Sequence, residues 1–219
     1  MSVLNEKDAK IVAERLGKLE RPVTVAVFTQ EADCDYCQPT RELVEELAGL
    51  SNGHVTVEIY DSIKDAEKAA AMSVDKFPAL VMLDAEGRDY GIRFFGIPAG
   101  YEFASLLETL DLMGKGDSGL SPATREKLGA LTEPLALQVF VTPTCPYCPR
   151  AVVTAFKFAM ESKLVTASMV EASEFPQLAA RYNVSGVPHT VIGESEEAMI
   201  GAYPEAAAVD MVLQAASAE

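Results

Sequence analysis

The stretch Val139-Phe140-Val141-Thr142-Pro143-Thr144-Cys145-Pro146-Tyr147-Cys148 decides the fold. It starts with an apolar run typical of a buried strand, turns at a proline, and then places two cysteines three positions apart. A helical pattern follows the second cysteine. The first thiol therefore lies near a helix start, where unpaired N–H groups favour a thiolate, and this arrangement predicts redox chemistry at Cys145 and Cys148.

The same arrangement occurs once more, 111 positions earlier in the chain. Val27-Phe28-Thr29 precedes the second pair, Cys34-Asp35-Tyr36-Cys37. Each pair is followed by a proline that opens an apolar run: Pro78 comes 44 positions after Cys34, and Pro188 comes 43 positions after Cys145. Two landmarks at matched spacing predict a duplicated unit.

Each unit is predicted to run strand–helix–strand–helix–strand–strand–helix, with one more helix before the first strand. The expected strands are 23–29, 55–60, 79–83 and 88–95, then 135–141, 166–171, 189–192 and 198–202. The expected helices are 5–18, the cysteine loop to 49, 64–72 and 101–113, then 122–131, a helix after Cys148, 174–182 and a last one from 204. Strands that alternate with helices predict the α/β class, with a central mixed sheet flanked by helices in each unit. The turn formers of 114–119 predict a linker between domains at 1–115 and 120–219.

Composition excludes several function classes. The chain has 219 residues, 49% of them hydrophobic, and a net charge of −15, which disfavours nucleic acid and anionic membranes as partners. No apolar run is long enough to span a membrane, and the first residues become polar too early for a signal peptide. We therefore expect a cytoplasmic protein whose four cysteines serve redox chemistry or metal binding rather than a structural disulfide framework.

The expected chemistry is thiol–disulfide exchange. The first thiolate attacks a substrate disulfide, and the second thiol resolves the mixed disulfide. Pro78 and Pro188 are expected to follow cis peptide bonds, which would leave the backbone of Phe77 and Val187 free to pair with an extended substrate. Tyr147 offers flat apolar surface for substrate binding, or it covers the disulfide.

Cys145-Pro146-Tyr147-Cys148 followed by Gly186-Val187-Pro188 resembles the signature of the glutaredoxin and thioredoxin-like superfamily. With the second pair, the whole-length duplication resembles the glutaredoxin-like protein disulfide oxidoreductases of thermophilic archaea and bacteria. The resemblance implies two tandem thioredoxin-like units with protein disulfide reductase, oxidase or isomerase activity. It also implies redox-active disulfides without a bound cofactor, and electrons from NADPH through a thioredoxin-reductase-like flavoprotein. Disulfide-containing proteins, among them a peroxiredoxin, would be the substrates. Unlike thioredoxins, the chain has no Trp before either pair.

The two sites are not expected to be equal. Three carboxylates, Glu31, Asp33 and Asp35, surround Cys34, and nearby negative charge disfavours a thiolate. The loop around Cys145 carries no acid, so Cys145 and Cys148 are predicted to form the main site. Cys34 and Cys37 would relay electrons, tune isomerase activity or form a structural bridge. Neither unit shows an obvious buried acid near its cysteines for proton transfer.

Other interpretations remain at this level. Four cysteines are also a common zinc set, although Cys37 and Cys145 lie 108 positions apart, far more than in zinc ribbons. A thioredoxin-like fold without redox chemistry would act as a chaperone or docking protein. His189, next to Pro188, is either a packed residue or a group that changes charge near the active site.

Overall fold

The structure, a computed structural model, describes residues 3–193 and 198–216. These residues form two compact units. The first contains the chain up to Asp89, with Phe94–Ile97 and Leu110–Gly116; the second contains Tyr90–Arg93, Pro98–Thr109 and the chain from Asp117 onward. The predicted fold class, α/β with mixed sheets flanked by helices, is confirmed.

In the first unit the strands lie in the order β2-β1-β3, and β4 follows β3, with its ends in this unit and its residues Tyr90–Arg93 in the second. Their bounds are β1 Val23–Thr29, β2 Val55–Asp61, β3 Ala79–Leu83 and β4 Asp89–Phe95. β1 pairs in parallel with β2 and antiparallel with β3, so the sheet is mixed. All five side chains of β3 are buried, which agrees with a continuous apolar run in a central strand.

In the second unit the order is β6-β5-β7-β8, the same plan followed by a short edge strand. The bounds are β5 Leu135–Val141, β6 Val165–Glu171, β7 His189–Ile192 and β8 Ala198–Ile200. β5 pairs in parallel with β6 and antiparallel with β7, and β8 pairs antiparallel with β7. The repeated pairing scheme places each cysteine turn after the same strand, β1 in one unit and β5 in the other.

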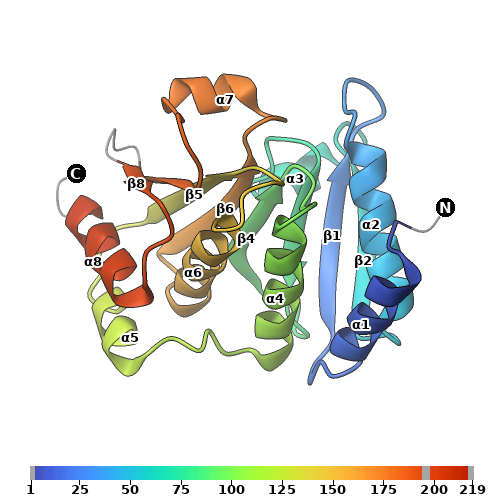
Figure 1. Cartoon of the computed structure of the whole chain (residues 1–219), viewed down its shortest axis with the longest axis horizontal. Coiled ribbons are helices and arrows are strands. Elements are labelled where there is room, and N and C mark those ends of the chain that lie inside the picture. Colours follow the sequence, from blue (N-terminus) through green and yellow to red (C-terminus); the bar gives the residue numbers. More distant parts are fainter. Residues whose placement is uncertain (1–2, 194–197, 217–219) are drawn as a thin grey trace. The chain divides into compact units, whose positions relative to one another are not determined.

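The helices follow the strands as predicted (Figure 1). They are α1 Glu6–Leu16, α2 Cys37–Leu50, α3 Ala66–Ala71, α4 Glu102–Lys115, α5 Pro122–Leu128, α6 Cys148–Glu161, α7 Pro176–Arg181 and α8 Glu205–Ala216. α2 packs on β1 and β2 through an apolar stripe that includes Leu43, Val44 and Leu47. α6 packs in the same way on β5 and β6.

The expected boundaries differ from the structure in a few places. α4 continues to Lys115, so the first two residues of the expected linker are helical. Gly116 follows the helix: its N–H donates to the carbonyls of Leu112 and Met113, and its positive φ of 67° turns the chain away from the helix. β8 ends at Ile200, two residues before the expected bound, and α7 is limited to six residues.

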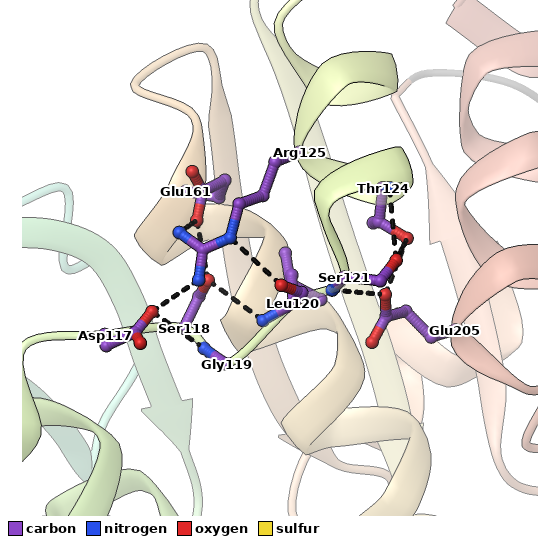
Figure 2. Close-up of polar contacts among 9 residues, drawn as sticks. All are labelled: Asp117, Ser118, Gly119, Leu120, Ser121, Thr124, Arg125, Glu161 and Glu205. Atoms are coloured by element: carbon purple, nitrogen blue, oxygen red, sulfur yellow. Dashed lines mark hydrogen bonds and ion pairs between the residues drawn. The ribbon is translucent and has the colours of Figure 1, made fainter.

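The segment after α4 is held to the second unit by polar contacts (Figure 2). Arg125 of α5 pairs with Asp117 and, at 2.8 Å, with Glu161, while the Ser118 hydroxyl donates to Glu161 at 2.6 Å. Ser121, the N-cap of α5, is the site of a further contact: its N–H donates to Glu205 at 3.0 Å. These bonds fix the start of the second unit. No described helix is both long and apolar enough to cross a membrane.

Candidate active site

The two cysteine pairs lie at equivalent strand-to-helix turns. Each pair is closed as a disulfide, with Cα atoms 5.4 Å apart for Cys34 and Cys37 and 5.5 Å apart for Cys145 and Cys148. The second cysteine of each pair is the first residue of a helix, α2 or α6, so the first cysteine lies just before the helix start. Cys37 and Cys148 are buried, Cys145 is 7% exposed, and Cys34 is half-buried and thus the most exposed of the four cysteines.

The backbone hydrogen bonds to sulfur differ between the pairs. In the second unit the Cys148 N–H donates to Sγ of Cys145, the first cysteine, at 3.1 Å. In the first unit the Gln30 N–H donates to Sγ of Cys37, the second cysteine, at 3.3 Å, while the Cys37 N–H points to the carbonyl of Cys34 at 3.4 Å. A donor to sulfur stabilises its thiolate form. A helix-start amide therefore contacts the sulfur of the first cysteine in the second unit, and a loop amide contacts the sulfur of the second cysteine in the first unit.

The acidic residues around Cys34 are only partly unpaired. Glu31 forms an ion pair with Lys64 at 2.8 Å, and its hydrogen bond raises the pKa of the lysine above its ordinary value. Asp33 adopts a positive φ of 55° and its carbonyl accepts from the Gln30 amide. One of the three carboxylates counted in the sequence is thus neutralised, which weakens the predicted charge difference between the sites without removing it.

Both prolines follow cis peptide bonds, as predicted. The ladders with the cysteine-bearing strands begin one residue after each proline, at Ala79 and His189, so Phe77 and Val187 lie outside them. Tyr147 and Tyr36 occupy the N-cap positions of α6 and α2 without a side-chain cap bond, and are 68% and 46% exposed. The structure thus leaves the predicted substrate-binding tyrosine at the surface.

The sequence did not indicate a buried acid, Glu102, which follows a contact with the loop before Cys145. Tyr101 donates its N–H to the carbonyl of Pro143, two residues before Cys145, at 2.9 Å. The next residue, Glu102, is 1% exposed, and burial raises its pKa to about 7, while a hydrogen bond from Ser105 opposes that shift. Gly100 permits this approach, because a Cβ there would lie 2.2 Å from the Pro143 oxygen. Glu102 is thus a buried acid that follows a residue in contact with the loop before Cys145, and no sequence pattern indicates it.

Comparison with known proteins places these features in a family. A family model described as a thioredoxin domain matches residues 135–214. A protein disulfide oxidoreductase from Aeropyrum pernix has a similar structure, with a TM-score of 0.90 and 30% identity, over 100% of this chain and 97% of that one. The chain belongs to the protein disulfide oxidoreductases. The resemblance inferred from the cysteine and proline motifs is confirmed.

This protein disulfide oxidoreductase is also similar to F subunits of alkyl hydroperoxide reductases. The alkylhydroperoxide reductase AhpF from Enterococcus faecalis has a structure with a TM-score of 0.87 and 27% identity, over 95% of this chain and 99% of that chain. The F subunit of alkyl hydroperoxide reductase from Staphylococcus epidermidis is 26% identical over 163 residues, which cover 74% of this chain. The matched region spans about 29% of that curated relative's length.

Other buried polar groups of the protein disulfide oxidoreductase pack rather than bind. His189 is 4% exposed, its ring lies edge-on to Phe140 at 6.2 Å, and desolvation lowers its pKa. Neither ring nitrogen of His189 has a hydrogen-bond partner within the described residues. Glu171, at the end of β6, accepts from the Glu174 N–H at 2.6 Å and so caps the following turn. The interpretation of His189 as a packed residue fits best.

The metal-binding alternative gains no support from the cysteines. Each pair is closed within its own unit, and a disulfide offers no thiolate ligand. Over residues 3–193 and 198–216, no group of three or more His, Cys, Asp or Glu side chains is placed to hold a metal ion.

Proposed function

We propose that this protein disulfide oxidoreductase catalyses dithiol–disulfide exchange mainly at Cys145 and Cys148, within two thioredoxin-like units at 1–115 and 120–219. The observation that carries the proposal is the Cys148 N–H, which points at Sγ of Cys145 at 3.1 Å. In the reduced protein this donor, at the start of α6, stabilises the Cys145 thiolate. The second thiol follows within the same turn, ready to close the disulfide.

The proposed exchange reaction proceeds in two steps through a mixed disulfide. The Cys145 thiolate attacks one sulfur of a substrate disulfide, the substrate S–S bond breaks, and one substrate thiolate leaves and takes a proton. Cys148, once deprotonated, attacks Cys145 Sγ in the mixed disulfide and releases the second substrate thiolate. The substrate is reduced by two electrons, and Cys145 and Cys148 end in the disulfide seen in the structure. The reverse sequence oxidises a substrate dithiol.

Glu102 is the group that we propose for proton transfer at this site. It is buried, its pKa lies at about 7, and its backbone neighbour contacts Pro143 beside Cys145. A group that titrates near the working pH both takes and gives protons at useful rates. Its carboxylate would remove the proton of Cys148, and its acid form would return a proton to a leaving thiolate.

Substrate is proposed to bind as an extended segment beside the prolines. Phe77 and Pro78 in the first unit, and Val187 and Pro188 in the second, end outside the internal ladders. The backbone groups of Phe77 and Val187 would pair with the segment on either side of the substrate cysteine, as in strand addition. Pro78 and Pro188 have no N–H, and their carbonyls already accept from Gly96 and Gly201. Tyr147, 68% exposed, would contact that segment with its ring.

Electrons would reach the disulfides from NADPH through a thioredoxin-reductase-like flavoprotein, and the protein itself would carry no cofactor besides its cysteines. Two relatives are F subunits of an alkyl hydroperoxide reductase, which makes a peroxiredoxin a reasonable substrate alongside other disulfide proteins. The cytoplasm is the proposed location, because C-x-x-C pairs used for exchange suit a reducing compartment.

The test is turnover of a disulfide-bonded model protein with dithiothreitol, and then with NADPH and a flavoprotein reductase. We expect Cys145→Ser to lower turnover at least about a hundredfold, because the attacking sulfur is lost. Cys34→Ser is the matched variant and should retain most of the activity. Equal losses in both variants would overturn the assignment of the main site, and full activity of Cys145→Ser would overturn the proposed mechanism.

A further inference from the structure

The disulfide of the first unit opens onto a cavity of about 540 Å³. Both sulfur-bearing residues of the pair line it, together with Thr29, Gln30 and Glu31 before them and Gln38, Arg41, Glu42 and Glu45 after them. Three of these side chains are acidic and one is basic. Glu31 pairs with Lys64, but Glu42 and Glu45 still outnumber Arg41, so the wall beside the disulfide is net negative.

The wall follows from the sequence of α2. Gln38, Arg41, Glu42 and Glu45 recur at helical spacing, so they form one exposed stripe that starts directly after Cys37. Along that stripe Gln38 donates to Glu42 at 2.7 Å, and Arg41 pairs with Glu45 at 2.9 Å. The cation of the wall is thus already engaged, and the stripe keeps a negative balance.

The second unit does not repeat this stripe. The equivalent positions after Cys148 are Pro149, Val152, Val153 and Phe156. Val152, Val153 and Phe156 are buried and belong to the apolar core of that unit. Duplication alone would have produced two similar helices, so the polar, open stripe is a property of the first site.

The sulfur chemistry of the first pair suits attack from outside. Cys34 is half-buried while Cys37 is 3% exposed, so an incoming thiolate reaches Cys34. Breaking the bond then leaves the charge on Cys37, whose sulfur accepts the Gln30 N–H at 3.3 Å. A stabilised leaving thiolate speeds exchange.

We propose that this cavity receives a cysteine carried on a positively charged protein segment, which reduces the disulfide between Cys34 and Cys37. The inference rests on the proposed exchange function and names the substrate class of its first site. The donor thiolate forms a bond to Cys34 Sγ, the Cys34–Cys37 bond breaks, and Cys37 leaves as a thiolate. A second donor thiol then attacks the donor sulfur, releases Cys34, and the donor ends as a disulfide. A lysine or arginine beside the donor cysteine would face Glu42, and Glu45 is shared with Arg41, whereas an acidic thiol such as glutathione is repelled.

The test uses the oxidised full-length protein and three cysteine peptides of equal length whose flanking residues are lysine, serine or glutamate. Samples are quenched with acid at short times, alkylated, and mapped by mass spectrometry, so that each pair is followed separately. At low ionic strength we expect the lysine peptide to reduce Cys34 and Cys37 about tenfold faster than the glutamate peptide, and the ratio to approach one at about 0.5 M salt. The pair Cys145 and Cys148, read in the same samples, should show a smaller ratio, which reflects the net charge of the whole protein rather than a local acidic wall.

Charge variants locate the effect. Glu42→Gln with Glu45→Gln should lower the lysine-to-glutamate ratio at least about threefold, and Arg41→Gln should raise it. Glu14→Gln with Glu20→Gln removes two exposed charges elsewhere in the first unit and should leave the ratio unchanged. Equal rates with all three peptides at Cys34, or a ratio that survives the Glu42 and Glu45 changes, would overturn the charge preference alone. If no peptide reduces either pair, the proposed exchange function falls with it.

Discussion

The two cysteine turns have the same spacing, the same strand before them and the same helix start after them, and yet their surroundings differ in kind. Cys145 is 7% exposed and its sulfur accepts a helix-start amide, and the buried Glu102 follows a residue whose N–H binds the preceding loop. Cys34 is half-buried and lines an acidic cavity. Its disulfide partner Cys37 accepts the N–H of Gln30 at its sulfur. We infer that the C-x-x-C motif provides the exchange chemistry, and that the surrounding residues determine which sulfur attacks and which substrates reach it.

We expect the largest difference between the two units when the second cysteine of each pair is replaced. Cys148→Ser leaves the attacking Cys145 intact but removes the sulfur that resolves the mixed disulfide, so we expect turnover to fall about a thousandfold and a covalent complex with substrate to accumulate. Cys37→Ser, the matched change in the first unit, should cost less than about threefold. Non-reducing gels with a disulfide substrate read both quantities. A covalent complex formed equally by the two variants would mean that both units attack substrate alike.

Glu102 has no counterpart among the groups described beside Cys34, and its removal should sharpen the contrast. A proton-transfer group contributes about a hundredfold or more, so Glu102→Gln should lower turnover at Cys145 by about that factor above pH 7. Because the pKa of Glu102 is about 7, the limb of the pH–rate profile with a midpoint near 7 should disappear. Glu108→Gln, at an exposed position of the same helix, is the control. A profile that keeps its midpoint in Glu102→Gln would remove this residue from the mechanism.

Glu102→Gln should also change the pH dependence of the free energy of unfolding. This effect is expected even if Glu102 has no role in proton transfer. The folded pKa of Glu102, about 7, lies above the ordinary 4.5, so the acid form favours folding. That contribution is present below pH 4.5 and is lost as pH rises through 7, with an upper size of about 3 kcal/mol. Urea unfolding should therefore show Glu102→Gln gaining on the wild type between pH 5 and pH 8.

The sequence predicted most of the fold because the relevant signals are local. The apolar runs at 23–29, 79–83, 135–141 and 189–192 became strands with those bounds. The matched spacing of cysteines and prolines identified the duplication and the cis peptide bonds. Glu102 was missed because its burial depends on a contact between Gly100-Tyr101 and Pro143, about forty positions away, which no periodicity announces.

Hydrogen bonding at the sulfurs also lay beyond the sequence. Both turns have the same Cys-x-Tyr-Cys pattern, and only backbone geometry decides whether Cys145 or Cys37 accepts an N–H. The acidic count around Cys34 was correct, but the pairing of Glu31 with Lys64, 33 positions away, is a tertiary contact. Local rules therefore located the cysteine pairs, and long-range packing determined the contacts that surround each sulfur.

Cys145 and Cys34 should also differ in how readily their thiols ionise. In the reduced protein the Cys145 thiolate gains the Cys148 N–H, while Asp33 and Asp35 disfavour a thiolate at Cys34. We expect the midpoint of the pH dependence of alkylation to lie about one pH unit lower for Cys145, which makes its thiolate about tenfold more abundant near pH 7. The midpoint is the proper measurement, because the absolute rate also reflects the greater exposure of Cys34. Asp33→Asn with Asp35→Asn should narrow the gap, and midpoints that already coincide in the wild type would contradict the ranking.

The smallest effect expected is on acid stability, at the residue that follows each proline. This residue is the buried Ala79 in the first unit and His189 in the second. Burial lowers the pKa of His189, and its ring nitrogens have no hydrogen-bond partner among the described residues. A histidine with a lowered folded pKa takes up a proton more readily when unfolded, so its contribution to stability is present above pH 6.5 and is lost as pH falls below it. His189→Leu keeps the apolar volume and removes this titration, and between pH 7.5 and pH 5 its Tm should fall about 3 °C less than that of the wild type. His54→Leu, the other histidine of the chain, is the matched control in the first unit. If His189→Leu and the wild type lose the same Tm over that range, the buried imidazole is not the acid-sensitive difference between the units.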